Sequence, residues 1–236
     1  MKKAVIYNIV HIYVLYVKLK GDQSVKMKTR KFTEILEKTH IEMVMAFSEA
    51  LDAKDQYTAG HSRRVMEYSV GIAQHMKLPE NEIERVKKAA LLHDIGKIGI
   101  PDIVLHKAAK LTEEEFAVIK SHTEIGATIL KSIKSFKDFV PSVYHHHERY
   151  DGKGYPHGIK GEKIPLHARI IAVADTFDAM TSNRPYRKAF PLETALSEME
   201  RNKGVQLDPN IAAVFLKIFK YSPYYFSRFM EPEYYL

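Results

Sequence analysis

Seven histidine and aspartate side chains, at five separate places between residues 61 and 175, constrain the fold more than any other feature of the sequence. Each place adjoins or lies within a segment with helical periodicity. The side chains are His61, the pair His93-Asp94, His122, the pair His146-His147, and Asp175 in the apolar run IIAVAD. A carboxylate in such a run is costly unless it is paired or bound to a cation. A metal cluster formed by these groups would tie a helical bundle together at its centre.

The chain has no cysteine among its 236 residues, but it has 12 histidines. Disulfides, thiolate zinc sites and cysteine nucleophiles are therefore excluded, and any metal must be held by histidine and carboxylate. Five neutral imidazoles and two carboxylates suit a site for two divalent ions such as iron or manganese. A single histidine is more often hydrogen-bonded than metal-bound. We therefore predict structural roles for His11, His40, His75, His106, His157 and His167, and a supporting or surface role for His145.

Apolar residues recur at helical spacing from Phe32 onward, and strands are hard to place after it, so we predict an all-α bundle. Thr112 and Glu115 form a capping box, and Asp208 before Pro209 is a suitable N-cap. A helix beginning near Pro79 should end at His93-Asp94, with Gly96 placed to cap it. The predicted helical faces are Leu36, Met43, Phe47 and Ala50; Val65, Tyr68, Ile72 and Met76; Ile83, Val86 and Ala90; and Ile211, Val214, Phe215 and Ile218.

A longer stripe of apolar and small residues predicts one long helix after the capping box, with His122 early in it: Phe116, Ile119, Thr123, Gly126, Leu130 and Ile133. The glycine-rich segment Asp151–Lys163 is the one long loop predicted in the body. A helical domain usually keeps such a loop for function.

The net charge of +7 belongs entirely to residues 1–31, so the remainder is neutral and does not suggest a binder of nucleic acid polymers. Residues 4–17 are apolar but shorter than the roughly 20 residues of a membrane helix. They could form a short membrane anchor, an element packed on the body, or the end of a sensor region. Residues 21–31 suggest a linker. We expect an appendage over residues 1–31, a domain over residues 32–236, and a cytoplasmic protein with membrane association left open.

Six motifs together resemble the HD-GYP family: YTAGHS (57–62), HDIGKIGIP (93–101), HTEIG (122–126), HHERYDGKGYP (146–156), VADTFDAMTSNRPYR (173–187) and LDP (207–209). The resemblance covers about residues 32–220, with all motifs in order. These bacterial enzymes are metal-dependent phosphodiesterases of the HD superfamily that act on cyclic di-GMP. The resemblance therefore implies an HD-type helical bundle with a long GYP loop and a short N-terminal appendage.

The resemblance also implies roles for individual residues. The metal ligands would be His61, His93, Asp94, His122, His146, His147 and Asp175, with Asp94 bridging two ions. Asp94 and Lys97 would be catalytic, and the substrate contacts would be Gly154, Tyr155, Arg184 and Arg187. Some members hold a third metal with a glutamate four residues before the first histidine; here that position is Tyr57, so we expect two metals. The family's Lys-Pro-Gly before Leu-Thr is replaced by Lys107–Lys110 (KAAK), which should change loop stiffness but no ligand.

The expected reaction is attack of a metal-activated hydroxide on phosphorus, giving linear pGpG, GMP or both. Two alternatives stay open. One is a module that senses a cyclic dinucleotide without cleaving it and passes the signal to a partner protein. The other is an HD hydrolase of a different cyclic dinucleotide or of a nucleoside phosphate, although GYP and RPYR argue against the latter. The resemblance also leaves a homodimer open.

Overall fold

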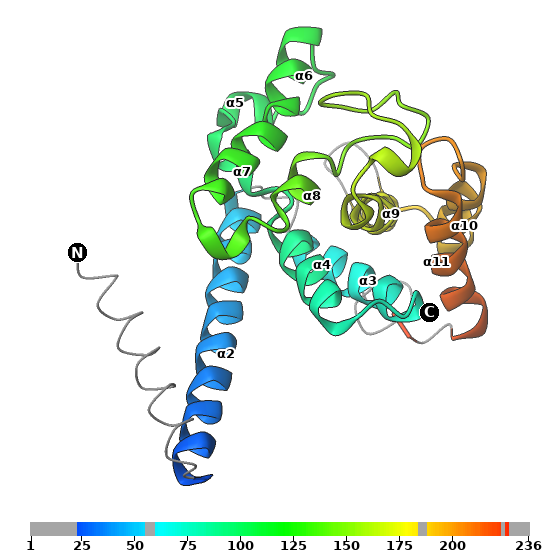
Figure 1. The fold of residues 1–236 in the computed structure, drawn as a ribbon. Helices are drawn as coiled ribbons and strands as arrows, with labels where there is room; N and C mark the ends of the chain where they lie inside the picture. Colours follow the sequence, from blue (N-terminus) through cyan, green and yellow to red (C-terminus); the bar gives the residue numbers. More distant parts are fainter. Residues whose placement is uncertain (1–22, 55–59, 184–187, 223–224, 227–236) are drawn as a thin grey trace. The chain divides into compact units, whose positions relative to one another are not determined.

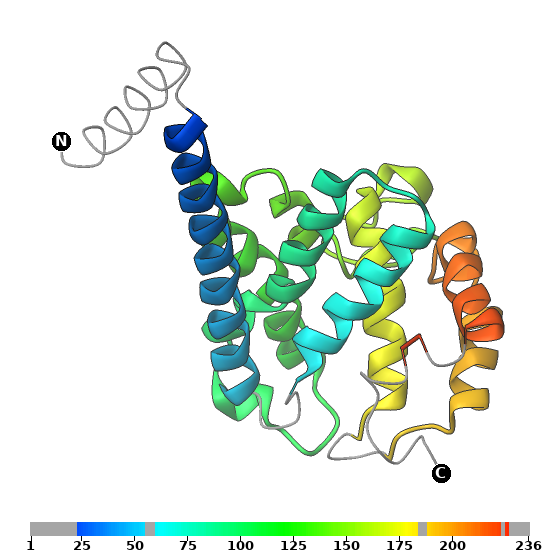
Figure 2. The same ribbon diagram turned by 90° about the horizontal axis from the view of Figure 1, so that it is seen from below.

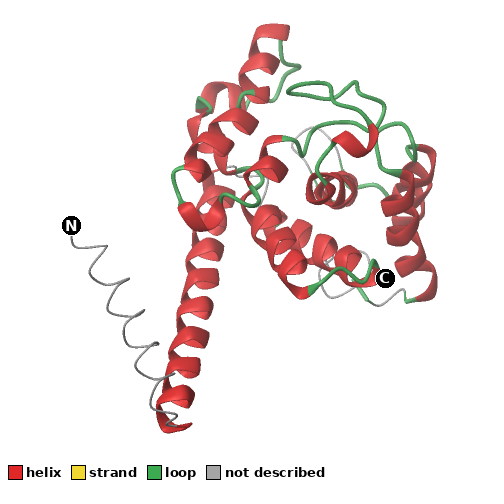
Figure 3. Cartoon of the chain, viewed as in Figure 1, coloured by secondary structure: helices red, strands yellow, loops and turns green. Residues whose placement is uncertain are grey.

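The structure is a computed structural model that describes residues 23–54, 60–183, 188–222 and 225–226. Helices dominate this part of the chain, and no β-strand occurs in it (Figure 3), as the sequence predicts. The α-helices are α2 (Gln23–Lys54), α3 (His61–His75), α4 (Glu80–Leu92), α5 (Asp102–Leu105), α6 (Glu113–Lys120), α7 (His122–Lys131), α8 (Val140–Tyr144), α9 (Leu166–Thr181), α10 (Leu192–Arg201) and α11 (Pro209–Tyr221). The 3-10 helices are η1 (Ile95–Gly99), η2 (Lys134–Phe136) and η3 (Gly161–Lys163).

The chain divides into two compact units, Met1–Met43 and Val44–Leu236. The described part of the first unit is helical, so the predicted linker over residues 21–31 lies in α2 from Gln23 onward. Lysine, arginine, glutamine and methionine are good helix formers, and Arg30 adds an i,i+4 ion pair with Glu34 at 2.9 Å. The expected boundary between residues 31 and 32 falls within α2. The predicted membrane contact through residues 4–17 lies outside the described residues.

The second unit has its core where α3 packs against α4 and α9, and where α11 packs against α3, α9 and α10 (Figures 1 and 2). Tyr68 of α3, Phe177 of α9 and Phe215 of α11 are fully buried. Tyr68 contacts the other two rings edge-on, with centroid distances of 5.3 and 6.2 Å. Burial of each such ring contributes roughly 2–3 kcal/mol. The predicted faces of α3, α4 and α11 are thus confirmed as core surfaces.

The predicted long helix after the capping box is wrong, although the capping box itself is confirmed. The segment forms two helices, α6 and α7, with a turn at Ser121 between them. Three consecutive side chains bond to carbonyls three residues back: Ser121 to Val118 at 2.7 Å, His122 to Ile119 at 2.6 Å, and Thr123 to Lys120 at 3.1 Å. Such bonds compete with the helical ladder. The break therefore places His122 at the first position of α7.

Gly96 has a different role from the predicted one. Helix α4 ends at Leu92 with His93 as its C-cap, as expected, but Gly96 lies within η1. A Cβ on Gly96 would lie 1.8 Å from the His122 carbonyl oxygen and 2.6 Å from the Gly126 nitrogen. Glycine is therefore required because the backbone of η1 lies directly against α7.

The predicted loop over residues 151–163 is confirmed, with η3 at its end. Its base is tied to the turn before α11, because Tyr150 N donates to Gln206 O at 3.0 Å and Asp151 N to Val205 O at 2.8 Å. The predicted N-cap of α11 is also confirmed, since Asp208 accepts from Asn210 N and Ile211 N. None of the helices in the described part of the chain combines the length and apolar character needed to cross a membrane.

Candidate metal centre and active site

Asp94 lies at the centre of a buried cluster of histidines. Its Oδ2 is 3.5 Å from His93 Nε2 and 3.8 Å from His61 Nε2. Its Oδ1 is 3.3 Å from His122 Nε2 and 3.8 Å from His146 Nε2. Each carboxylate oxygen thus faces two imidazoles, an arrangement suited to a carboxylate that bridges two ions.

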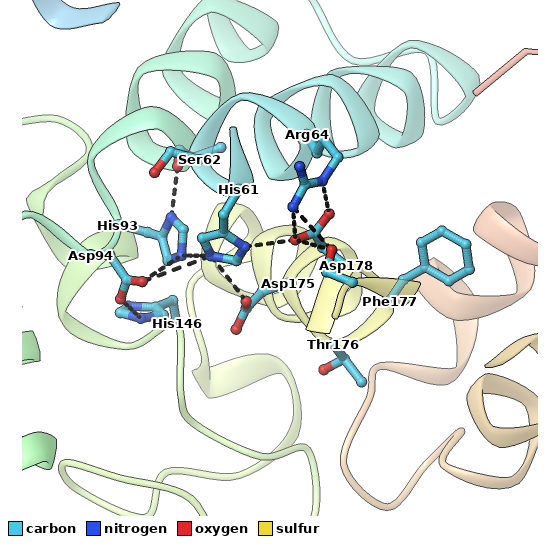
Figure 4. A network of polar contacts seen from close by, with 12 residues as sticks. His61, Ser62, Arg64, His93, Asp94, His146, Asp175, Thr176, Phe177 and Asp178 are labelled. Carbon is cyan, nitrogen blue, oxygen red and sulfur yellow. Dashed lines mark hydrogen bonds and ion pairs between the residues drawn. The ribbon is translucent and has the colours of Figure 1, made fainter. Parts of the chain in front are cut away.

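The other ring nitrogen of each of these histidines is already bonded. Three Nδ1–H groups donate to the carbonyl three residues back: His93 to Ala90 at 2.7 Å, His122 to Ile119 at 2.6 Å, and His146 to Val143 at 2.6 Å. His61 Nδ1 lies 2.7 Å from Asp178 Oδ2, and Figure 4 shows His61 between Asp178 on one side and His93 and Asp94 on the other. A proton held at Nδ1 leaves the lone pair on Nε2, which is the arrangement typical of metal-binding histidine.

The spacing of these Nε2 atoms fits a metal site. His61 and His93 approach to 3.3 Å, and His122 and His146 approach to 3.4 Å. Two lone pairs that face each other so closely repel unless a proton or a cation lies between them. Metal–nitrogen bonds of about 2.0–2.1 Å give nitrogen pairs at about this separation. The buried histidine and aspartate side chains are therefore consistent with a centre for two metal ions.

The remaining predicted ligands also lie here. The His147 ring centroid is 4.0 Å from that of His146 and 5.1 Å from that of His122. Asp175 Oδ1 is 3.5 Å from His61 Nε2. Two compact groups of possible ligand atoms share Asp94: one has His61 and His93, and the other has His122, His146 and His147. Asp175 adjoins the first group. All seven predicted ligands are thus together, while Tyr57 lies outside the described residues.

At His93, His147 and Asp94 the electrostatics favour the forms that bind cations. Burial lowers the pKa of His93 to about 4. Burial, with His146 and His122 beside it, holds the pKa of His147 well below its usual value. Burial opposes ionisation of Asp94, but Lys97 and His93 hold the pKa of this carboxyl well below its usual range. Neutral imidazoles and an ionised carboxylate are the forms that coordinate metals.

Lys97 is held close to this centre by η1. Its Nζ lies 2.8 Å from Asp94 Oδ2. The end of α2 supports the same turn, because Lys54 Nζ donates to the carbonyls of Lys97 at 3.3 Å, Ile98 at 3.0 Å and Ile100 at 3.1 Å. The predicted catalytic lysine therefore sits on a braced backbone segment.

The GYP loop packs onto the histidine cluster. The Tyr155 ring lies 4.8 Å from the His147 ring, at an interplanar angle of 34°. A Cβ on Gly154 would lie 2.3 Å from Arg149 N and 2.5 Å from His147 O, so a close backbone approach requires this glycine. Burial raises the pKa of Tyr155, which keeps the hydroxyl protonated. Arg184 and Arg187, the other predicted substrate contacts, lie outside the described residues.

A cavity of about 830 Å³ opens beside the cluster, and its wall includes side chains that were not predicted to be site residues. They are Arg64, Lys107, Lys110, Phe116 and Asp178. Asp178 orients His61 and is itself bound by Arg64, with Nε–Oδ1 at 2.6 Å. One signal was present in the sequence: Asp178 and Arg64 each lie three residues, about one helical turn, after a predicted ligand.

Three of the histidines predicted to have structural roles are hydrogen-bonded, whereas His11 lies outside the described residues. His75 Nδ1 lies 2.8 Å from Gly71 O, His106 Nε2 lies 2.9 Å from Lys54 O, and His167 Nε2 lies 2.8 Å from Glu82 Oε2. His145 and His157 instead lie together, with His157 Nδ1 at 3.3 Å from His145 Nε2.

Solved structures share this fold. A crystal structure of a cyclic GMP-AMP-specific phosphodiesterase of Vibrio cholerae matches with a TM-score of 0.63 at 21% identity, over 81% of this chain and 51% of that one. An HDG"Y"P protein of Bdellovibrio bacteriovorus matches with a TM-score of 0.57 at 20% identity, over 68% of this chain and 51% of that one.

Sequence comparison gives closer matches. The 3'3'-cGAMP-specific phosphodiesterase 3 of Vibrio cholerae is 41% identical over 181 residues, which are 77% of this chain and 39% of that protein. A cyclic di-GMP phosphodiesterase of Thermotoga maritima is 45% identical over 169 residues, 71% of this chain and 46% of that protein. The cyclic di-GMP phosphodiesterase response regulator RpfG of Xanthomonas campestris is 40% identical over 184 residues, 77% of this chain and 49% of that protein. The chain thus spans less than half the length of these relatives.

A family model described as "HD domain" matches residues 45–211, which include every side chain of the histidine and aspartate cluster. The motifs, the helical fold and the relatives agree with this match. The chain therefore belongs to the HD domain family and is homologous to the HD-GYP cyclic di-GMP phosphodiesterases.

Proposed function

We propose that this chain is a metal-dependent phosphodiesterase that hydrolyses cyclic di-GMP to linear pGpG, GMP or both. The observation that carries the proposal is the position of Asp94, whose two oxygens each face two histidines while Lys97 contacts Oδ2 at 2.8 Å. The relatives named cyclic di-GMP phosphodiesterases supply the substrate class. The seven predicted ligands would hold two divalent ions, iron or manganese.

Two divalent ions held by these ligands would, when bound, supply a hydroxide nucleophile at neutral pH and positive charge beside the phosphate. The chain's own residues would offset the charge of the phosphate and orient the ligands of the ions. The Lys97 ammonium lies close enough to the cluster to offset charge that grows on the phosphate oxygens. Asp178 keeps the His61 ring oriented, since Oδ2 accepts from Nδ1 at 2.7 Å.

The cavity supports a substrate larger than a mononucleotide. Its volume of about 830 Å³ is within the range of small-molecule sites. Four basic side chains line it: Arg64, Lys97, Lys107 and Lys110. Tyr155 and Phe116 add aromatic surface suited to a base. We place one phosphate at Lys97 and keep Arg184 and Arg187 as proposed phosphate contacts.

A second substrate is favoured by one observation. The relative from Vibrio cholerae that is 41% identical to this chain is named specific for 3'3'-cGAMP. A mixed guanine–adenine cyclic dinucleotide is therefore the alternative substrate. A sensor that only binds such a molecule is disfavoured, because the cluster holds all seven predicted ligands.

The test is a turnover assay on anaerobically purified, iron- or manganese-loaded protein with cyclic di-GMP and 3'3'-cGAMP side by side. We expect linear dinucleotide or mononucleotide products from cyclic di-GMP at the higher rate. A higher rate on 3'3'-cGAMP would reverse the substrate assignment. Tight binding of either compound without any product would show a sensor instead.

Replacing Lys97 by alanine should lower turnover by about 100-fold, because one charge that stabilises the transition state is lost. Metal content should remain close to that of the wild type, as measured by elemental analysis of the same samples. Lys131→Ala, which removes an exposed lysine from α7, is the matched control and should leave both quantities unchanged. Loss of metal in Lys97→Ala would mean that Lys97 supports the site structurally.

The partners of the protein follow from the same proposal. The substrate is a cyclic dinucleotide, and nucleic acid polymers are not expected. Partner signalling proteins, a homodimer and membrane association through residues 4–17 remain predictions.

A further inference from the structure

A second group of possible metal ligands lies at the junction of α8 and the GYP loop. It consists of His145, Glu148 and His157, and one nitrogen or oxygen from each lies within 4.8 Å of those of the other two. His145 is the C-cap of α8, while His157 belongs to the loop. None of the three is needed for the reaction proposed above.

The two imidazoles are already arranged as ligands. His145 Nδ1–H donates to the Pro141 carbonyl at 2.8 Å, which leaves the lone pair on Nε2. That Nε2 lies 3.3 Å from His157 Nδ1. The separation equals the edge of a tetrahedral shell with metal–nitrogen bonds of about 2.0–2.1 Å. The Tyr144 ring packs against both imidazoles, with centroid distances of 4.9 Å to His145 and 5.2 Å to His157.

Glu148 provides an independent observation. Its side chain is buried, with only 3% of the residue exposed. Oε1 accepts the His157 backbone N–H at 2.8 Å. Oε2 is buried and has no hydrogen-bond partner among the residues that the structure describes. A buried carboxylate oxygen without a partner is costly and needs an explanation, and a cation beside two imidazoles supplies one.

The surroundings leave a path for an ion. His157 is exposed and His145 is half-buried, so solvent reaches the imidazole side of the group. Water can then fill the remaining coordination positions. Two nitrogens and one carboxylate oxygen suit zinc, nickel or copper better than magnesium or calcium, which prefer oxygen ligands.

We propose that His145, Glu148 and His157 form a metal site separate from the Asp94 cluster. This site takes a borderline divalent ion such as Zn²⁺ and ties the GYP loop to the end of α8. Tyr155 lies two residues before His157 in the same loop, so occupancy would fix the loop residue that packs on His147. The site is independent of whether the Asp94 cluster hydrolyses cyclic dinucleotides.

The test is equilibrium dialysis of the full chain against Zn²⁺ after treatment with a chelator, followed by metal analysis. His157→Ala and His145→Ala should each bind one equivalent of Zn²⁺ fewer than the wild type, or bind that equivalent at least about 10-fold more weakly. His75→Ala is the matched control, because its Nδ1 is bonded to the Gly71 carbonyl in α3. This variant should bind as the wild type does.

A second readout follows the loop itself. Lys153 and Lys160 lie in the loop segment, so Zn²⁺ should slow tryptic cleavage after them in the wild type but not in His157→Ala. Circular dichroism would establish that each variant is folded. Unchanged zinc stoichiometry and affinity in folded His157→Ala would overturn the proposal and leave the two histidines as a hydrogen-bonded pair.

Discussion

Asp94→Ala should lose both metal and hydrolysis, with a fall in turnover of about 10³-fold or more. The two oxygens of Asp94 face both histidine pairs, at 3.3–3.8 Å. Removal of Asp94 would take a proposed ligand from each of the two ions at once. Loss of several kcal/mol of transition-state stabilisation corresponds to a rate loss of this size.

The measurement pairs elemental analysis with turnover on the same anaerobic preparation. Asp94→Asn keeps the volume of the side chain, removes its charge and replaces one accepting oxygen by a donating NH2 group, so it separates loss of the ligand from loss of packing. Asp138→Ala removes an exposed carboxylate that pairs with Arg85 at 3.2 Å, and it should bind metal and turn over as the wild type does. Full metal content in Asp94→Asn would contradict the bridging role.

Most of the predicted ligands lie at or next to helix ends, while Asp175 lies within α9, and it was the resemblance to the HD-GYP motifs that indicated which of these side chains act together. His61 follows Gly60 directly and begins α3, and His93 is the C-cap of α4. Side chains at helix ends can point to a common centre without disturbing the apolar faces that pack the bundle. The sequence therefore predicted both the all-α fold and which side chains come together.

The turn at Ser121 could not be read from periodicity, because the apolar stripe continues across it. Hydrogen bonds from Ser121, His122 and Thr123 to carbonyls three residues back decide the outcome, and periodicity does not report them. The same holds for Gly96. Its position after a helix suggested a cap, whereas the real reason is contact with a segment far along the chain.

Asp178 and Arg64 were missed for a related reason. A carboxylate one turn after a predicted ligand is common on helices, and only the folded arrangement shows that Asp178 reaches His61 on another helix. The cavity wall from Lys107 to Lys110 is a similar case. Its departure from the family pattern suggested a change in stiffness only, but the segment lines the proposed substrate cavity.

Gly96→Ala should both destabilise the domain and displace Asp94 from His122. The added Cβ would meet the His122 carbonyl oxygen at 1.8 Å and the Gly126 nitrogen at 2.6 Å, and both are backbone atoms of α7 that cannot rotate away. η1 must therefore move, and it begins directly after Asp94 and contains Lys97. We expect a loss of about 3 kcal/mol in the free energy of unfolding, which is the upper end for overpacking in a core, and a large loss of metal affinity.

Gly99→Ala is the matched control because it adds the same methyl group to the same 3-10 helix. There the nearest neighbour is the Ile125 side chain at 3.1 Å, which can shift by a few tenths of an ångström. We expect a cost below about 1 kcal/mol and normal metal binding. Urea unfolding with a chelator present measures stability apart from metal, since a bound ion would itself stabilise the folded state. Equal stability of the two variants would mean that η1 does not pack on α7 as closely as the structure has it. It would also mean that this packing does not hold Asp94 against His122.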